Sequence, residues 1–424
     1  MTQQTTRLAG KKARHFLTAT ALAALPVALM PALASAADLE ITHWWTSGGE
    51  AAAVKELAAM FEAQTGNKWV DGAIAGSGSV ARPVIISRIL GGDPMAATQL
   101  NHGQQALELI EAGLMQDLTD IAEAGKWRDI VQPVSLLDAC TVDGKVYCVP
   151  LNIHSPQWMW TSPAAFEAAG VAPATNWEEL TAAAPALEAA GKVPLSLGKQ
   201  GWQENTLLQT LIAGLAGAEV YEAAFGKGDE SVLNGPEMTG VFEALVTARD
   251  LAKNSNVQDW NLATAQVING DAAAQVMGDW AQGEFALAGK VAGKDYDCFI
   301  GMGGEPVIST GGDAFYFPVN KDPAVTAAQK ELAQVLISPE AQVAFNLKKG
   351  SLPVRGDVDL SKAGTCMQKG LATLKAGNVI PSVDQLISPD SRGQVEDLMA
   401  EFFGSEMSGA DAQARFAKII ESDK

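Results

Sequence analysis

Between residues 37 and 153, short apolar segments typical of strands alternate with segments that have helical periodicity. Residues 39–45 predict a strand, and residues 49–64 follow with apolar side chains at helical spacing and Thr65-Gly66-Asn67 as a stop signal. Further elements are expected as helices at 82–91 and 104–112 and as strands at 97–101 and 147–153. This alternation predicts an α/β chain whose helices flank the sheets.

The order of the segments predicts two lobes. A long region rich in Ala, Leu and Glu follows residue 153 and is expected to be helical, after which glycine-rich residues 301–312 lead into a strand at 314–319. Strands that resume after a long helical insertion suggest that the chain returns to its first lobe. Several crossings between two lobes would form a hinge with a cleft, and the chain is too long for one core.

The first 36 residues have the pattern of a secretory signal. Four basic residues between positions 7 and 14 precede an apolar run over 16–33 and an A-x-A cleavage site, Ala34-Ser35-Ala36. A membrane anchor is the alternative, because the run is nearly long enough to span a bilayer. Small residues at its end and the lack of stop-transfer charges favour cleavage. We therefore expect a periplasmic protein that begins near Ala37, without stable membrane insertion.

The charge of this mature chain limits its partners. The full sequence has 30 Lys and Arg, and removing the four in the leader leaves 26 against 49 Asp and Glu, a formal charge of −23. So acidic a surface repels nucleic acid and anionic lipid. The balance favours a neutral or cationic small ligand and argues against nucleic acid as a partner.

All four cysteines lie in the mature chain and are expected to form two disulfides. Cys140 and Cys148 flank an Asp-Gly hairpin turn, so the arms that carry them lie close enough to pair. Cys298 and Cys366 remain as the second couple, and two disulfides suit an oxidising compartment. A metal site is the alternative, but the spacings match no zinc pattern and histidine is scarce. No metal or cofactor is expected.

Two adjacent tryptophans, Trp44 and Trp45, stand where the first predicted strand ends. Core packing would explain one of them. Successive strand side chains point to opposite faces, so a strand buried on one face would expose the other ring. At the carboxyl end of a strand in an α/β sheet, that ring faces the crevice where ligands bind. An indole face there suits an amphipathic ligand such as a pyranose.

Polar residues near these tryptophans are candidates for the same ligand. Glu50 falls in the first turn of the next predicted helix, where a carboxylate either favours the helix dipole or accepts from two neighbouring sugar hydroxyls. Gln99 and Asn101 share one face of the strand at 97–101, although a solvated loop is the alternative. His154 is interpreted as a hydrogen-bonded residue at the crossing between lobes rather than as a catalyst.

Three motifs in the second half of the chain supply further candidates. Trp280 interrupts an apolar stretch in MGDWAQGEF, and core packing explains it equally well on its own. Asp313 follows two glycines, which let its carboxylate approach a ligand closely. Lys348 and Lys349 precede the turn in KKGSLPVR.

Together these motifs resemble the periplasmic solute-binding proteins of ABC sugar importers. VDGKVYCVP and KKGSLPVR are similar to segments of the wider family, and the double tryptophan with TSGGE resembles the glucose/mannose-binding branch. The resemblance implies an α/β fold of two lobes, the type II or maltose-binding-protein-like form, with a hinge and a central cleft. It implies lobe boundaries at 1–36 (signal peptide), 37–152 and 313–348 (N-terminal lobe), and 153–312 and 349–424 (C-terminal lobe).

The resemblance also assigns roles to residues. Trp44 and Trp45 would stack on the sugar, and Glu50 would accept from its hydroxyls. Gln99 and Asn101 would line the cleft. Trp280 would stack on the sugar from the facing lobe. Asp313 would bind a sugar hydroxyl, and Lys349 would donate a hydrogen bond to a sugar hydroxyl. This chain has Asn101 where some relatives carry histidine, and no histidine follows His154.

The resulting hypothesis is a monomeric receptor, not an enzyme, that binds a monosaccharide and delivers it to an inner-membrane ABC permease. Glucose is the expected sugar, with mannose or galactose next. The same fold could instead bind a disaccharide, a polyol or a polyamine, although Lys349 in the site would oppose a cation. The alternative of another class is an exported glycoside hydrolase that uses Glu50 and Asp313 as paired carboxylates.

Overall fold

The first sheet gathers strands from distant parts of the chain. The structure is a computed structural model that describes residues 1–2 and 36–424, so the predicted signal peptide lies almost wholly outside the described residues. The strand order is β2-β1-β3-β12-β6, with bounds β1 (Asp38–His43), β2 (Lys68–Ala73), β3 (Ala97–Asn101), β6 (Cys148–Pro150) and β12 (Asp313–Tyr316). β1 pairs in parallel with β2 and β3, whereas β12 runs antiparallel between β3 and β6. The returning strand thus places Asp313 opposite Asn101.

The second sheet corrects the expectation of a long helical insertion. It has the order β10-β7-β9-β8, with β7 (Trp158–Thr161), β8 (Val193–Ser196), β9 (Ala272–Val276) and β10 (Asp297–Ile300). These strands are four or five residues long, and β9 reads AAAQV. Alanine is depleted in strands and common in helices, so the sequence carried no strand signal there. Two short pairs complete the strands: β4 (Thr141–Val142) with β5 (Lys145–Val146), and β11 (Ile308–Ser309) with β13 (Val379–Ile380).

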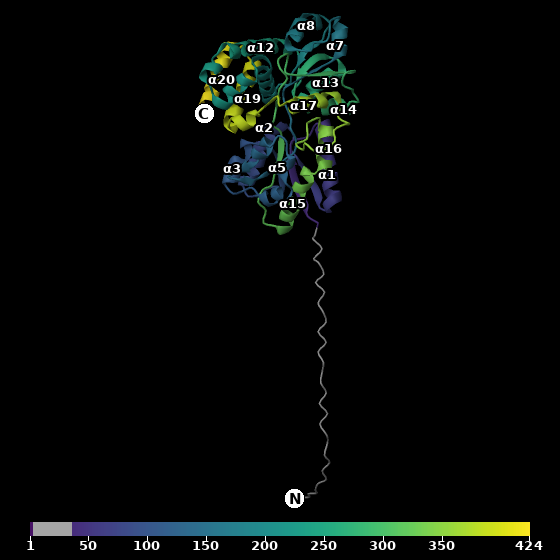
Figure 1. The fold of residues 1–424 in the computed structure, drawn as a ribbon, viewed down its shortest axis with the longest axis vertical. Coiled ribbons are helices and arrows are strands. Elements are labelled where there is room, and N and C mark those ends of the chain that lie inside the picture. The colour runs from purple at the N-terminus through teal and green to yellow at the C-terminus, as the bar shows by residue number, and fades with distance from the viewer. Residues whose placement is uncertain (3–35) are drawn as a thin grey trace. The chain divides into compact units, whose positions relative to one another are not determined.

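Helices surround both sheets (Figure 1). Up to the end of β9 the helices are α1 (Gly48–Thr65), α2 (Ser77–Leu90), α3 (Leu107–Glu111), α4 (Thr119–Ala124), α5 (Trp127–Ile130), α6 (Ser135–Asp138), α7 (Pro163–Ala169), α8 (Trp177–Ala189), α9 (Gly201–Leu211), α10 (Ala218–Tyr221), α11 (Glu230–Leu233), α12 (Pro236–Ala252) and α13 (Trp260–Asn269). The later ones are α14 (Ala281–Leu287), α15 (Pro323–Ile337), α16 (Pro339–Lys349), α17 (Thr365–Ala376), α18 (Val383–Leu386), α19 (Pro389–Phe403) and α20 (Gly409–Asp423). One 3₁₀ turn and two π turns are η1 (Gln104–Ala106), η2 (Ile212–Ala216) and η3 (Glu222–Lys227).

Capping residues set the ends of α1 and α16, the two helices that carry Glu50 and Lys349. The side chain of Ser47 caps α1 by accepting from the amide of Glu50, which places Glu50 in the first turn. α1 ends at Gly66, whose left-handed φ of 75° suits glycine, as the sequence predicted. α16 begins with Pro339 after the cap Ser338 and ends before Gly350, so Lys349 is its last residue. The two helices lie side by side (Figure 1).

Two predicted helices differ from the observed ones. α2 begins at Ser77, five residues before the expected start, and contains Pro83. The proline is tolerated because Ser79, whose carbonyl it leaves without a helical donor, is exposed to solvent. The helix expected at 104–112 is divided into η1 and α3.

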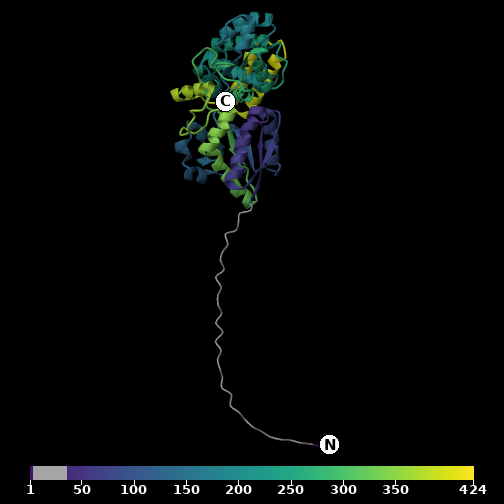
Figure 2. The ribbon, with the colours of Figure 1, turned by 90° about the vertical axis from the view of Figure 1, so that its right-hand side faces the viewer.

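Each sheet has its own buried apolar core. One cluster joins β1, β3 and β12 to α1, α2, α15 and α16, and a second surrounds β8 and β9 with α9, α12, α19 and α20. Residues 36–424 nevertheless form one compact unit. Figure 2 shows the purple N-terminal elements in one half of this unit and the teal middle elements in the other. The boundaries of the two lobes stay a prediction. None of the helices in the described residues is long and apolar enough to cross a bilayer.

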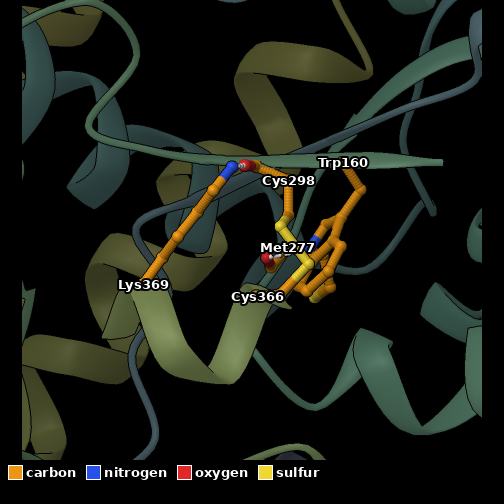
Figure 3. Close-up of a disulfide and its surroundings, with 5 residues drawn as sticks. All are labelled: Trp160, Met277, Cys298, Cys366 and Lys369. Carbon is orange, nitrogen blue, oxygen red and sulfur yellow. Dashed lines mark hydrogen bonds between the residues drawn. A yellow bond between two sulfur atoms is a disulfide. The ribbon is translucent and has the colours of Figure 1, made fainter. Parts of the chain in front are cut away.

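Both predicted disulfides are confirmed. Cys140 pairs with Cys148 beside the hairpin, and Cys298 pairs with Cys366. The second bridge joins β10 to the first turn of α17 (Figure 3). Lys369, one turn further along α17, donates to the carbonyl of Cys298 at 2.6 Å, and Trp160 donates to the carbonyl of Met277 at 2.7 Å. The bridge therefore fixes α17 against the second sheet.

Candidate ligand-binding cavity

The two tryptophans after β1 have different surroundings. Trp45 is 1% exposed, and its ring centroid lies 5.7 Å from that of Phe315 and 5.2 Å from that of Phe345. Trp44 is half-buried. Both line a cavity of about 300 Å³. The structure therefore agrees with the expectation that one ring packs into the core while the other stays open, and it places both at the same cavity.

A buried row of three charged residues lines the cavity. The Nζ of Lys349 donates to Oε1 of Glu50 at 2.8 Å and lies 3.8 Å from Oδ2 of Asp313. The three residues, named the inner cluster below, are all under 10% exposed. Burial opposes the charge of Lys349, but the carboxylates of Glu50 and Asp313 outweigh it and raise its pKa. The lysine is therefore charged at neutral pH.

Buried amides hold Asp313 in place. Gln99 donates to one of its carboxylate oxygens at 2.6 Å, and Asn152 donates to the other at 2.8 Å. Burial of Asp313 opposes its negative charge, but His154, Lys349 and these amides together lower its pKa. Gln99 is fully buried, and its carbonyl oxygen accepts from the amide of Trp44 at 3.0 Å. The sequence had led us to expect that Gln99 lines the cavity. It lies behind the cavity wall instead, where it holds Asp313 and the backbone of Trp44.

Asn101 does line the cavity, where it meets a second group of charges. Its Nδ2 donates to Oδ2 of Asp384 at 2.7 Å. Arg392 donates to the other oxygen of Asp384 and, at 3.0 Å, to Glu396. Asp384, Arg392 and Glu396 are named the outer cluster. Asp384 and Arg392 line the cavity.

The remaining wall comes from the second half of the fold. Trp280 follows β9 and is half-buried, with its ring centroid 5.1 Å from that of His154 and 6.5 Å from that of Trp202. All three line the cavity, as does Gln209. His154 was interpreted as a crossing residue, and its Nε2 lies 3.9 Å from Asp313. Burial lowers the pKa of His154, so the ring is neutral near pH 7.

Of the eight sequence-predicted ligand residues, seven line the cavity: Trp44, Trp45, Glu50, Asn101, Trp280, Asp313 and Lys349. Sequence reasoning missed Arg82, Trp202, Gln209, Trp260, Asp384 and Arg392, which also line it. No local pattern pointed to them. Only the abundance of tryptophan, ten in this chain, was a signal for Trp202 and Trp260.

The cavity presents aromatic faces and polar groups together. Trp44 and Trp280 both line it, and carboxylates, amides and an ammonium group supply acceptors and donors. Such a wall suits a ligand with apolar faces and many hydroxyl groups. Among the residues that the structure describes, no group of His, Cys, Asp and Glu has the arrangement of a metal site.

Comparison with known sequences gives one family and several relatives. The sequence model of a family described as "Bacterial extracellular solute-binding protein" matches residues 45–343. A "Probable sugar-binding periplasmic protein" of Rhizobium meliloti (strain 1021) is 34% identical over 420 residues, which cover 97% of this chain and 100% of the relative.

Solved structures share the fold. A chitin oligosaccharide binding protein superposes with a TM-score of 0.75 at 23% identity, covering 92% of this chain and 99% of the other. The bacterial solute receptor AcbH, described as having an exclusive substrate preference for β-D-galactopyranose, gives 0.74 at 19% identity, with 91% and 98% covered. These likenesses confirm the predicted two-lobed receptor fold.

Proposed function

Because the chain belongs to the bacterial extracellular solute-binding protein family, we propose that it is the periplasmic substrate-binding component of an ABC transporter. Its ligand would be a monosaccharide, glucose, which it would deliver to an inner-membrane permease. The Rhizobium meliloti relative, named as a probable sugar-binding protein, supports a sugar as the ligand. Export by the leader, with cleavage next to Ala36, belongs to the same proposal.

The observation that carries the proposal is that the inner cluster lines the same cavity as Trp44 and Trp280. Glu50, Lys349 and Asp313 offer buried charged acceptors and a charged donor in one row. Charge-assisted hydrogen bonds of this kind favour vicinal hydroxyls, which both donate and accept. The half-buried rings of Trp44 and Trp280 would cover C–H faces of a pyranose.

The two halves of the fold contribute different parts of this site. Trp44 and the inner cluster belong to the first half, whereas Trp280 and Trp202 belong to the second. A sugar that contacts both halves stabilises the arrangement in which they are close, by its differential affinity for that arrangement. Such closure is what a permease could distinguish from the empty receptor.

The geometry of the cavity favours one alternative, a disaccharide ligand, and disfavours the other, a glycoside hydrolase. A disaccharide is favoured by Trp202 and Gln209, which add a second aromatic ring and an amide to the cavity wall near Trp280. A glycoside hydrolase is not favoured, because the ammonium of Lys349 lies within 4 Å of both candidate carboxylates and pairs with each. Membership of a solute-binding family also argues against turnover.

Thermal shift with a panel of monosaccharides tests the ligand. We expect glucose to raise the melting temperature, because a ligand that binds only the folded state stabilises it. In calorimetric titration, Glu50→Gln should weaken glucose binding by roughly 10-fold to 150-fold, since it removes a charged acceptor. Glu56→Gln, on the same helix and 42% exposed, is the matched control. The proposal fails if no monosaccharide binds or if glucosides are hydrolysed.

A further inference from the structure

Three cations line the cavity, and one of them has no counter-ion. Lys349 pairs with Glu50 and Asp313, and Arg392 pairs with Asp384 and Glu396. For Arg82 on α2, no carboxylate lies within salt-bridge distance in the part of the chain that the structure describes. Its side chain faces a cavity in which every other cation is neutralised.

Asp384 and Glu396 are the carboxylates whose charges act on Arg82, and both already accept hydrogen bonds from other residues. One oxygen of Asp384 accepts from Gln105 and Arg392, and the other accepts from Asn101. Both oxygens of Glu396 are also occupied, one by the guanidinium of Arg392 and the other by the hydroxyl of Ser79 at 3.0 Å. All four oxygens are thus engaged without Arg82.

The position of Arg82 is built into the fold. Its guanidinium lies over the ring of Trp44, 5.8 Å from the centroid. Gly78 leaves the space for both side chains, since a Cβ there would lie 2.7 Å from Nη1 of Arg82 and 3.2 Å from the Trp44 ring. Burial lowers the pKa of Arg82 to about 10, so it stays charged at neutral pH. Arg82 is half-buried, and charges that are partly withdrawn from water in proteins are normally paired.

We propose that Arg82 beside Trp44 is a subsite for an anionic substituent, so that a glucose derivative with a carboxylate or a phosphate binds as well, and more tightly than glucose itself. The planar guanidinium matches either anion with two parallel hydrogen bonds. This inference rests on the proposed function, because the inner cluster and the tryptophans hold the sugar ring. It adds that the ring of such a derivative carries a negative charge toward α2, which the acidic surface of the whole protein would not suggest.

Calorimetric titration with three probes tests the inference: D-glucose, D-glucuronate and D-glucose 6-phosphate. We expect at least one anion to bind ten or more times more tightly than glucose. Comparing glucuronate with glucose 6-phosphate shows whether Arg82 prefers a carboxylate or a phosphate. Arg82→Gln should remove this advantage, so that neither anion binds this variant more tightly than glucose does. Arg88→Gln, on the same helix but paired with Glu40 outside the cavity, should change neither. Raising the salt concentration should weaken the anion more than glucose.

Two results would overturn the inference while leaving the proposed function intact. One is that glucose binds and neither anion binds more tightly. The other is that Arg82→Gln weakens all three probes equally, which would make Arg82 a structural contact between the halves. If Arg82→Gln does not fold, the comparison of the three probes on the wild-type protein decides alone. Failure of all three probes would reject the proposed function as well.

Discussion

The inner and outer clusters are both groups of charges at one cavity, the inner one buried and the outer one half-buried, and they are assembled differently. Glu50, Asp313 and Lys349 come from α1, β12 and α16, which share the first core. Asp384, Arg392 and Glu396 come from α18 and α19, which pack in the second core. The outer cluster is completed by donors from the first half, Asn101 among them. The inner cluster is therefore internal to one half, whereas the outer cluster joins the two.

This difference separates two tasks. A cluster within one rigid half keeps its geometry when the halves move, so it can present a preformed binding row. A cluster shared between halves forms completely only when they are close, so its hydrogen bonds contribute to closure. The adjacent tryptophans follow the same division. The ring of Trp45 covers Lys349 of the inner cluster at 5.2 Å, and that of Trp44 covers Arg82 beside the outer one.

The largest effect is expected when the inner cluster loses its cation. Lys349→Met leaves two buried carboxylates without a cation, so the free energy of unfolding should fall by roughly 3–5 kcal/mol. Glucose binding should be lost as well. Denaturant unfolding and calorimetric titration measure both. Lys348→Met is the control, because that side chain is 56% exposed and should change stability by less than about 0.5 kcal/mol. Equal effects of the two substitutions would refute a preformed inner cluster.

Substitution of Trp45 should mainly lower the stability of the protein, whereas substitution of Trp44 should mainly lower its affinity for glucose. Trp45→Ala empties a packed site and should lower the free energy of unfolding by about 3–5 kcal/mol. Trp44→Ala removes a half-buried ring and should mainly weaken glucose binding, by about tenfold or more. Melting of the ligand-free variants and titration of each with glucose measure the two effects. The division would be wrong if Trp44→Ala lost as much stability as Trp45→Ala.

A histidine between the clusters predicts a pH dependence. His102 is fully buried near Asp313 and Asp384, and burial lowers its pKa to about 4 from an ordinary 6.5. Between these values the unfolded chain binds a proton that the folded chain does not. Stability should therefore fall as the pH drops from 6.5 to 4, by up to about 3 kcal/mol from this group. Urea unfolding across that range should show a shallower decline for His102→Gln. A profile parallel to that of the wild-type protein would contradict the assignment.

The smallest effect is expected at the outer cluster. Asp384→Asn keeps the shape and one accepting oxygen but removes the charge that three donors bind. Because these donors come from both halves, closure should suffer more than the folding of either core. X-ray scattering with saturating glucose should give a larger radius of gyration than for the wild-type protein. Asp390→Asn, on the exposed first turn of α19, should leave it unchanged. A compact Asp384→Asn complex would show that the outer cluster does not contribute to closure.

The sequence predicted the parts of the molecule whose signals are local. The end of β1, the place of Glu50 in the first turn of α1 and the glycine stop of that helix were all readable from neighbouring residues. The second sheet was not readable, because short alanine-rich strands such as β9 have helical composition. Tertiary pairing of β9 with β7 and β8, each distant in sequence, overrides that preference.

The same distinction applies to the site. Trp44 and Glu50 stand in one motif, and Asp313 and Lys349 stand in motifs of their own, so their residue types pointed to a ligand. Asp384 could not be found in this way, because its partner Asn101 is 283 residues away. Gln99 and Asn101 show the limit of a shared strand face. The two residues are two positions apart on β3 and so share a face. Gln99, however, is hydrogen-bonded to Asp313 and to the amide of Trp44, and it influences the cavity only by positioning these two residues.

The bridge between Cys298 and Cys366 makes the returning chain a closed covalent ring. The ring leaves the second sheet at β10, adds β12 to the first sheet, passes through α15 and α16, and rejoins at α17. Asp313 and Lys349 both lie on it. A single protease cut after exposed Lys321 would therefore break the chain without releasing either piece. The two fragments should migrate as one species on a non-reducing gel and as two after reduction, and the nicked receptor should keep its ligand until the thiols are freed.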